Sequence, residues 1–353
     1  MAELQEAASR IITEATGAEA GMVTSGASAA LTLATAACLA GFDVNRMSRL
    51  PDTTGMKNEI IVHRSHRNDY DHALRAAGAH LVEVGYSYYT FPHEIENAIG
   101  PSTVAFFYLA GGEASCVPLD RFAEIAHRHR LPVIVDAAAE LPPRGNLKAF
   151  VAAGADLVAF SGGKHLRGPQ STGVLCGRRD LILSATLQHQ DMDVFPETWP
   201  LRQLIADGVL AGPPHHGIGR GFKVGKEEIV GLLTALQLYA KRDLESERQG
   251  WMQDMETVVS EVREIPGVKA CVVYPQPSGR EVPHALLTID PKLAAIDANA
   301  VIRALHKGDP SICAFERFAN SGLVVIMPEA LRPGEAEIIA QRLKQILTSK
   351  KST

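Results

Sequence analysis

The chain has 353 residues, which is long for a single hydrophobic core and predicts a large domain joined to a smaller one. Hydrophobic residues make up 46% of it and charged residues 21%, as in ordinary globular proteins. The formal net charge of −5, without a long basic run, argues against nucleic acid or an anionic membrane as a partner.

The cysteines and the N-terminus favour a cytoplasmic protein. The cysteines are scattered, odd in number and without C-x-x-C spacing, so we expect neither a disulfide framework nor a metal site. No basic segment precedes an apolar core at the N-terminus, and the apolar stretch 27–41 is too short to span a bilayer. The cysteines are Cys38, Cys116, Cys176, Cys271 and Cys313.

The first feature in chain order is the segment from Thr24 to Ser28, which opens an alanine-rich helix. Small and hydroxyl residues at a helix start leave backbone N–H groups free to bind an anion, which the helix dipole favours. This pattern predicts a phosphate site formed by Ser25, Gly26, Ala27 and Ser28. The alternative is simple N-capping of the helix by Thr24 or Ser25.

Short β-rich runs then alternate with helical patterns. Continuously apolar strands that alternate with helices are typical of a mainly parallel sheet covered by helices on both faces. Ligands of such sheets bind at the carboxyl ends of the strands. The predicted strands are Glu59–His63, His80–Val84, Thr103–Leu109, Pro132–Asp136, Leu157–Phe160 and Gly173–Cys176, and the predicted helices among them are Asp69–Ala77, Leu119–His129 and Leu147–Ala153.

Three basic side chains, Arg64, His66 and Arg67, follow the first of these strands. An imidazole at a strand end is suited to stack on the ring of a ligand and to help move protons. A structural role is an equally good interpretation for His66 and a better one for His63 and His72.

Two other strand ends carry an acid and a lysine. Asp136 ends a buried run, where an unpaired carboxylate is costly, and Lys164 lies among glycines that permit close approach of a ligand. A carboxylate that keeps a pyridinium nitrogen protonated and a lysine that forms a Schiff base are what pyridoxal phosphate needs. We therefore predict a pyridoxal phosphate site, with Ser161 near the phosphate. The alternatives are a helix-capping Asp136 and an ordinary loop Lys164.

The chain beyond this motif begins with an irregular stretch and continues into a smaller α+β domain. Residues 178–221 contain many prolines, glycines and histidines and are expected to form a functional or subunit-contacting loop. The basic segment 219–226 leads into a long helix, and its two interpretations are a phosphate clamp and a solvated helix start. The helix is predicted from Gly225 or Lys226 to about Ala240 and continues into the charged stretch 241–248. The C-terminal elements are predicted as strands Gly267–Tyr274, Ala285–Ile289 and Gly322–Met327 and helices Ile296–Leu305 and Gly334–Leu347. We expect an N-terminal arm over residues 1–13, a large domain over 14–244 and a small domain over 245–353.

Together these residues resemble the fold-type-I pyridoxal phosphate enzymes, within them the selenocysteine synthase-like and D-glucosaminate-6-phosphate ammonia-lyase branch. The resemblance rests on segments 161–164 and 168–170 around the lysine, on 136–143 and on 223–228. It implies that Lys164 forms the Schiff base, that Asp136 partners the pyridine nitrogen and that His66 lies near the ring face. It also implies that residues 25–28 and Ser161 lie near the phosphate. Lys223 would reach into a neighbouring subunit's site, which makes the protein at least a homodimer.

The resemblance also implies an activity. Selenocysteine synthases carry an extra N-terminal domain that grips tRNA, whereas this chain enters the cofactor domain soon after its start, so the ammonia-lyase type is the closer analogue. We expect a lyase that acts on an amino acid or amino-sugar acid by α-proton abstraction and β-elimination, with Arg67, Arg317 or Arg332 as candidates for binding a substrate carboxylate. Racemase, aldolase and transferase activities use the same machinery, and a regulatory protein that only binds the cofactor is the non-enzymatic alternative. Neither dinucleotide nor P-loop glycine motifs occur, which disfavours a nucleotide enzyme.

Overall fold

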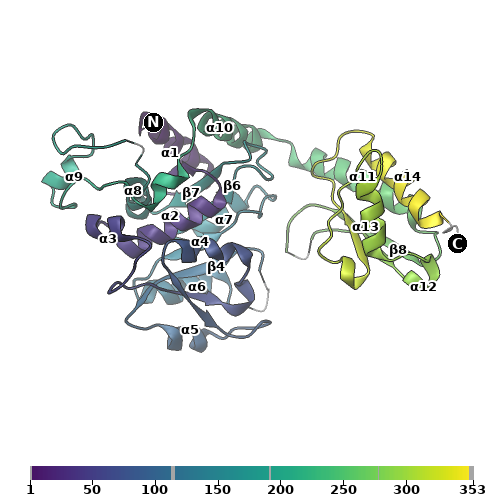
Figure 1. Ribbon diagram of the computed structural model, residues 1–353, viewed down its shortest axis with the longest axis horizontal. Coiled ribbons are helices and arrows are strands. Elements are labelled where there is room, and N and C mark those ends of the chain that lie inside the picture. Colours follow the sequence, from purple (N-terminus) through teal and green to yellow (C-terminus); the bar gives the residue numbers. More distant parts are fainter. Residues whose placement is uncertain (1, 113–115, 191, 277, 350–353) are drawn as a thin grey trace. The chain divides into compact units, whose positions relative to one another are not determined.

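The computed structural model describes residues 2–112, 116–190, 192–276 and 278–349 (Figure 1). The chain forms two compact units that divide between Lys241 and Arg242. Among the described residues, no helix combines the length and apolar character needed to cross a membrane.

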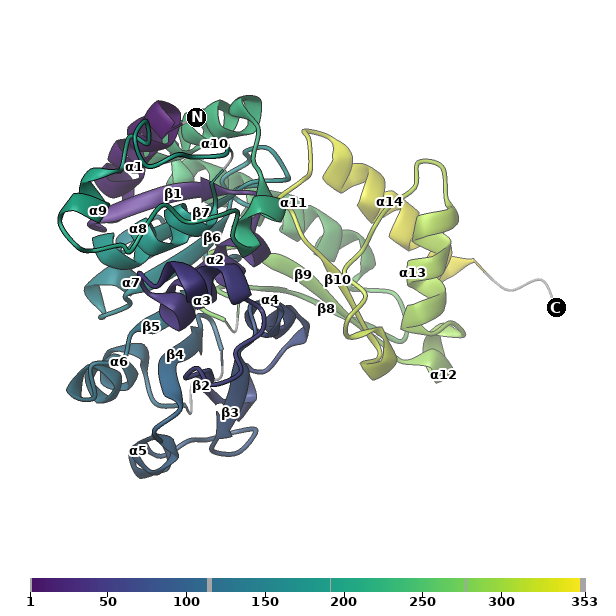
Figure 2. The same ribbon diagram turned by 60° about the vertical axis from the view of Figure 1, so that its left-hand side comes forward.

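The N-terminal unit is built on a seven-stranded sheet with the order β1-β7-β6-β5-β4-β2-β3 (Figure 2). Strands β2 to β6 pair in parallel, whereas β7 pairs antiparallel with both β6 and β1. The strands are β1 (Ala20–Thr24), β2 (Glu59–His63), β3 (His80–Val84), β4 (Thr103–Leu109), β5 (Val133–Asp136), β6 (Leu157–Ser161) and β7 (Gly173–Gly177).

Helices cover both faces of this sheet because its central strands are apolar on both sides. Ile134 and Ala159 pack in one buried cluster with Leu33 and Ala34 of the alanine-rich helix α2, which crosses β4 to β7. On the other face, the Phe106 ring lies 4.8 Å from that of Phe122 in α6. The helices of this unit are α1 (Ala2–Thr16), α2 (Ala27–Ala40), α3 (Val44–Arg49), α4 (His72–Ala76), α5 (Pro92–Ala98), α6 (Leu119–Arg128), α7 (Asn146–Ala152), α8 (Arg179–Gln188), α9 (Gln203–Ala206) and α10 (Lys226–Lys241), with 3-10 turns η1 (Arg64–His66), η2 (Asp69–Asp71) and η3 (Ile218–Phe222).

The C-terminal unit has a hydrophobic core of its own. An antiparallel sheet of order β10-β9-β8 packs with the longer helices of the unit around buried Val258, Leu287 and Leu343. The elements are α11 (Leu244–Val262), β8 (Val268–Val273), β9 (His284–Ile289), α12 (Pro291–Ala294), α13 (Ala298–Lys307), η4 (Ala319–Ser321), β10 (Leu323–Ile326) and α14 (Glu335–Thr348).

The predicted architecture is confirmed, and all six strands expected in the large sheet are present. Two expectations were wrong. The stretch 178–221 is not irregular throughout, because α8 forms at its start and packs against α2. The long helix does not run through 241–248: α10 ends at Lys241, and Asp243 caps a new helix by accepting a hydrogen bond from the Ser246 N–H at 3.1 Å. The domain limits at residues 13 and 244 stay predictions.

Candidate active site

The residues singled out from the sequence of the N-terminal unit gather at one edge of its sheet. Asp136 is the last residue of β5 and Ser161 the last of β6, and these strands run in parallel. His66 follows β2 by one short turn, and Lys164 follows β6 by another. Because parallel strands end at the same edge, these residues lie at the edge where ligands of α/β proteins usually bind.

Asp136 is a buried carboxylate at the centre of this edge, only 7% exposed. Its Oδ1 accepts a hydrogen bond from the Ala138 N–H at 3.0 Å. Burial raises the pKa of Asp136 above its ordinary value, although the Ala138 bond and the charge of Lys164 act against that rise. A cationic partner, such as a protonated ring nitrogen, would stabilise the ionised form of this buried carboxylate.

Lys164 lies on a turn that only glycines permit. The Gly162 N–H donates to the Thr172 carbonyl oxygen at 2.8 Å, and a Cβ on Gly162 would collide with the Thr172 hydroxyl. A Cβ on Gly163 would lie 2.6 Å from the Cα of Gln170. The turn therefore closes tightly and leaves Lys164 exposed at its tip.

The start of α2 lies beside this turn. Thr24, Gly173 and Ser161 pair across the adjacent strands β1, β7 and β6. A Cβ on Gly173 would lie 2.5 Å from the Gly26 carbonyl carbon, so Gly173 lets the helix start approach the sheet. No side chain caps the helix, since the Thr24 hydroxyl donates to the Gly26 carbonyl oxygen at 2.9 Å instead. Thus the capping alternative is wrong, and the first N–H groups of α2 can bind an anion.

His66 is fully buried, and burial lowers its pKa to about 4. Its Nδ1 accepts a hydrogen bond from the Leu109 N–H at 3.2 Å. His63 is equally buried, and its ring packs 4.6 Å from that of Phe122, which fits the structural interpretation. His72 is exposed on α4.

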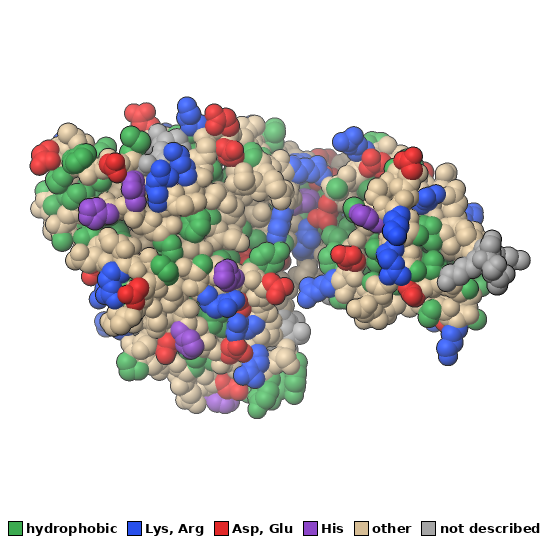
Figure 3. All heavy atoms as spheres, viewed as in Figure 1, with side chains coloured by type: hydrophobic (Ala, Val, Ile, Leu, Met, Phe, Trp, Pro, Cys, Tyr) green, Lys and Arg blue, Asp and Glu red, His purple; other side chains and the backbone are tan. Residues whose placement is uncertain are grey.

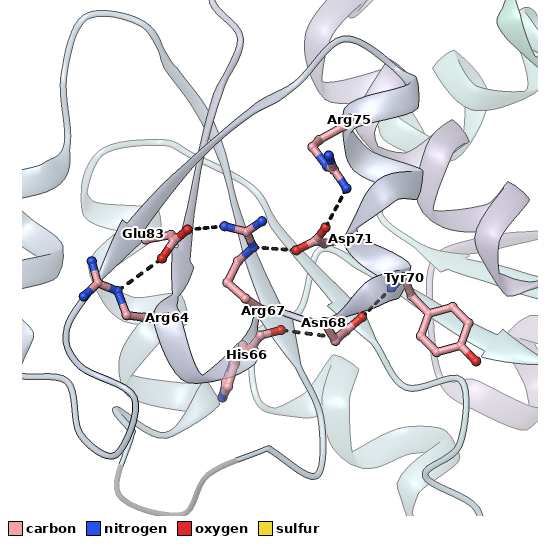
Figure 4. Close-up of polar contacts among 8 residues, drawn as sticks. All are labelled: Arg64, His66, Arg67, Asn68, Tyr70, Asp71, Arg75 and Glu83. Carbon is pink, nitrogen blue, oxygen red and sulfur yellow. Dashed lines mark hydrogen bonds and ion pairs between the residues drawn. The ribbon is translucent and has the colours of Figure 1, made fainter. Parts of the chain in front are cut away.

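The remaining candidates are basic residues with different surroundings. Arg67 already binds the carboxylates of Asp71 and Glu83, as Figure 4 shows. Lys223 is exposed between η3 and α10. Arg317 belongs to the C-terminal unit, where it is exposed and lies 6.0 Å from the ring of Phe318; Arg332, also exposed, belongs to that unit as well.

Two neighbours of His66, Tyr108 and Gly112, were not predicted from the sequence, and neither was the close approach of Gly111 to Glu140. The Tyr108 ring contacts that of His66 edge-on at 4.6 Å, and burial raises the pKa of Tyr108 to about 12. A Cβ on Gly112 would lie 2.6 Å from Nε2 of His66, and one on Gly111 would lie 2.5 Å from Oε2 of Glu140. The aromatic residue and glycine pair at the end of a predicted strand were the available signal.

The described residues bring together no set of three side chains that could hold a metal ion. On the face shown in Figure 3, basic side chains are interspersed with acidic ones. That face of the molecule therefore presents no broad basic surface.

Comparisons with known proteins cover both units. The family model SelA, described as L-seryl-tRNA selenium transferase, matches residues 2–193. The chain is 33% identical, over 98% of its length and 81% of the relative, to a 5'-C-glycyluridine monooxygenase-decarboxylase from Streptomyces sp.. It is 30% identical, over 97% of its length and 85% of the relative, to the D-glucosaminate-6-phosphate ammonia lyase of Salmonella typhimurium. A solved structure of a D-glucosaminate-6-phosphate ammonia-lyase matches with a TM-score of 0.77 and 30% identity, covering 98% of this chain and 86% of that one.

Proposed function

The chain belongs to the SelA family of pyridoxal phosphate enzymes, and on this premise we propose that it is a lyase releasing ammonia from an amino acid or amino-sugar acid. The enzyme class and the cofactor expected from the sequence are confirmed. The observation that carries the proposal is the sequence identity to an ammonia lyase, which extends through both units and is accompanied by a match to a solved ammonia-lyase structure.

The residues at the sheet edge fit pyridoxal phosphate. The uncapped N–H groups at the start of α2, together with Ser161, would hold the phosphate. Asp136 would hold the ring nitrogen and Lys164 the aldehyde carbon. When bound, the cofactor supplies an electron sink that makes the α-hydrogen of an amino substrate acidic.

The chain's own residues then act on the substrate. Lys164, exposed on its closed turn, would take the α-proton at Nζ. Asp136 would stabilise positive charge on the ring nitrogen, and its burial strengthens that interaction. Loss of a β-hydroxyl followed by hydrolysis would release a keto acid and ammonia.

Decarboxylation of an amino acid is the second candidate activity. The identity of 33% to the Streptomyces monooxygenase-decarboxylase favours it. The products separate the two candidates, because the lyase releases ammonia and a keto acid whereas the decarboxylase releases carbon dioxide.

Two further roles complete the proposal. Arg67 and Arg317 stay candidates for binding a substrate carboxylate, and Arg67 would have to give up one of its two carboxylate partners to do so. Lys223 would reach into the site of a second copy, in a cytoplasmic homodimer or larger homo-oligomer. Light scattering of the purified protein gives the oligomeric state, and a monomer would contradict the shared site.

A visible absorbance spectrum before and after borohydride tests the core of this proposal. We expect a yellow band that reduction removes, with the label on the peptide that contains Lys164. Lys164→Ala should abolish both the label and ammonia release from D-glucosaminate-6-phosphate. The matched control is Lys148→Ala, an exposed lysine on α7 that should behave as wild type. A label elsewhere, or substantial turnover by Lys164→Ala, would contradict the assignment.

A further inference from the structure

The buried imidazole of His66 has a defined hydrogen-bonding state. Its Nδ1 accepts from the Leu109 N–H, so Nδ1 carries no proton. Burial lowers the pKa of His66 to about 4, which keeps the ring neutral at pH 7. A neutral imidazole has one proton, and here that proton lies on Nε2.

The Nε2 atom of His66 is buried and has no hydrogen-bond partner among the described residues. It lies beside Gly112, where a Cβ would be only 2.6 Å away, so a side chain at this position would collide with the ring. A buried N–H without a partner costs free energy, which a bound acceptor would recover.

The ring is held in one orientation by its neighbours. His63 and Tyr108 contact it edge-on, with centroid distances of 4.7 and 4.6 Å. His63 is itself buried, and burial lowers its pKa to about 3, so no charged imidazole faces His66 at neutral pH. Turning the ring over would lose the bond from Leu109.

The turn that carries His66 is braced from its other side. Arg64 and Arg67 flank His66 and both bind Glu83 of β3, Arg64 through Nε at 3.1 Å. Arg67 also binds buried Asp71, whose other oxygen lies 3.3 Å from Arg75. Figure 4 shows this chain of alternating charges, with the His66 side chain pointing away from it.

We propose that His66 is held as the neutral tautomer protonated on Nε2 and donates a hydrogen bond from that atom to an oxygen of the bound cofactor or substrate. The sequence suggested a proton carrier, whereas this geometry makes His66 a fixed donor. The identity of the acceptor rests on the proposed function, but the tautomer does not.

Nitrogen NMR of cofactor-free protein tests the tautomer directly. The protein carries 13 histidines, so His66 is assigned by the signals that vanish in His66→Gln. With ¹⁵N-labelled histidine at pH 7, we expect a protonated Nε2 and an unprotonated Nδ1. A proton on Nδ1, or a charged ring, would overturn the proposal.

Two substitutions separate donation from ring packing. His66→Gln keeps a side-chain N–H donor without the ring, whereas His66→Phe keeps a ring without the donor. We expect pyridoxal phosphate affinity, measured by absorbance, to fall about tenfold in His66→Phe and to stay within about threefold of wild type in His66→Gln. The matched control is His72→Gln, an exposed histidine that should change nothing.

The outcomes distinguish this proposal from the proposed function. Equal affinities of the Phe and Gln variants, or a weaker Gln variant, would overturn the donor role. If the wild type binds no pyridoxal phosphate, the proposed function fails, and the NMR result still decides the tautomer. If His66→Phe does not fold, the affinity of His66→Gln and the wild-type spectrum remain decisive.

Discussion

The burial of Asp136 affects both the stability of the cofactor-free protein and the role proposed for this residue. Its folded pKa lies above the ordinary value because the carboxylate is buried, so the folded state binds the proton more tightly than the unfolded state. As pH rises from the ordinary aspartate pKa through the raised folded pKa, this group therefore lowers stability. Ionising this buried carboxylate in the cofactor-free protein costs free energy.

We predict opposite effects of Asp136→Asn on stability and turnover. The amide oxygen can still accept from the Ala138 N–H, but the side chain cannot ionise, so the cofactor-free variant avoids the pH-dependent loss of stability and should melt at a higher temperature at pH 7. The stability gain should shrink as pH falls below the folded pKa. Turnover should fall by about 10²-fold or more, because the ring nitrogen loses its charged partner. Thermal melts from pH 4 to 8 and a steady-state assay check this, and a variant that turns over normally would remove Asp136 from the site.

Residue positions were easier to predict than residue partners. Asp136 and Lys164 stood out because an acid and a glycine-flanked lysine ended two predicted strands. The bond from Leu109 to His66 could not be predicted, because it joins residues 43 positions apart on different elements. Arg67 looked like a free cation for the same reason, since Glu83 reaches it only when β3 lies beside β2.

In strand β7, the lack of a side chain at Gly173 lets the start of α2 approach the sheet edge where the phosphate is proposed to bind. Gly173 lies between Thr24 of β1 and Ser161 of β6, and a Cβ on it would lie 2.5 Å from the Gly26 carbonyl carbon. That atom belongs to the backbone, so it can move away only if the start of α2 shifts. The approach of α2 to the sheet edge therefore depends on this glycine.

We predict that Gly173→Ala weakens pyridoxal phosphate binding and lowers the free energy of unfolding by about 1–3 kcal/mol, the usual cost of overpacking. The matched control is Gly145→Ala at the start of α7, where no atom lies within 4 Å of the added Cβ and φ is −54°. That variant should be neutral or more stable by about 0.4–1 kcal/mol. Denaturant unfolding and cofactor titration compare the two, and equal behaviour would exclude the close approach as the cause.

Elements with a clear hydrophobic pattern in their own sequence were predicted. Elements that form only because they pair with a neighbouring strand were not. Strand β5 is an apolar, β-branched run, and it was found. Strand β1 contains alanine, glycine and methionine and becomes a strand by pairing with β7. Helix α8 was hidden because prolines and glycines of residues 189–221 dominated the composition of the whole stretch, although 179–188 contain none.

The two units have separate cores, and all proposed cofactor-binding residues lie in the first. Leu33, Ile134 and Leu175 pack in a core of the N-terminal unit, and Val258 and Leu343 pack in that of the C-terminal unit. Each unit also contains one of the two tryptophans, both of them buried. They are Trp199 in the first unit and Trp251 in the second.

We therefore predict that pyridoxal phosphate stabilises the first unit selectively. A ligand that binds only the folded state adds about 2.7 kcal/mol at a hundredfold excess over its dissociation constant. In Trp251→Phe, the fluorescence of Trp199 should report a melting temperature that rises with the cofactor. In Trp199→Phe, that of Trp251 should report a smaller shift. Pyridoxal without phosphate is the control and should stabilise less, because the start of α2 then binds no anion. Equal shifts of both reporters would mean that the units unfold together, and no shift of Trp199 would contradict a cofactor site on the large sheet.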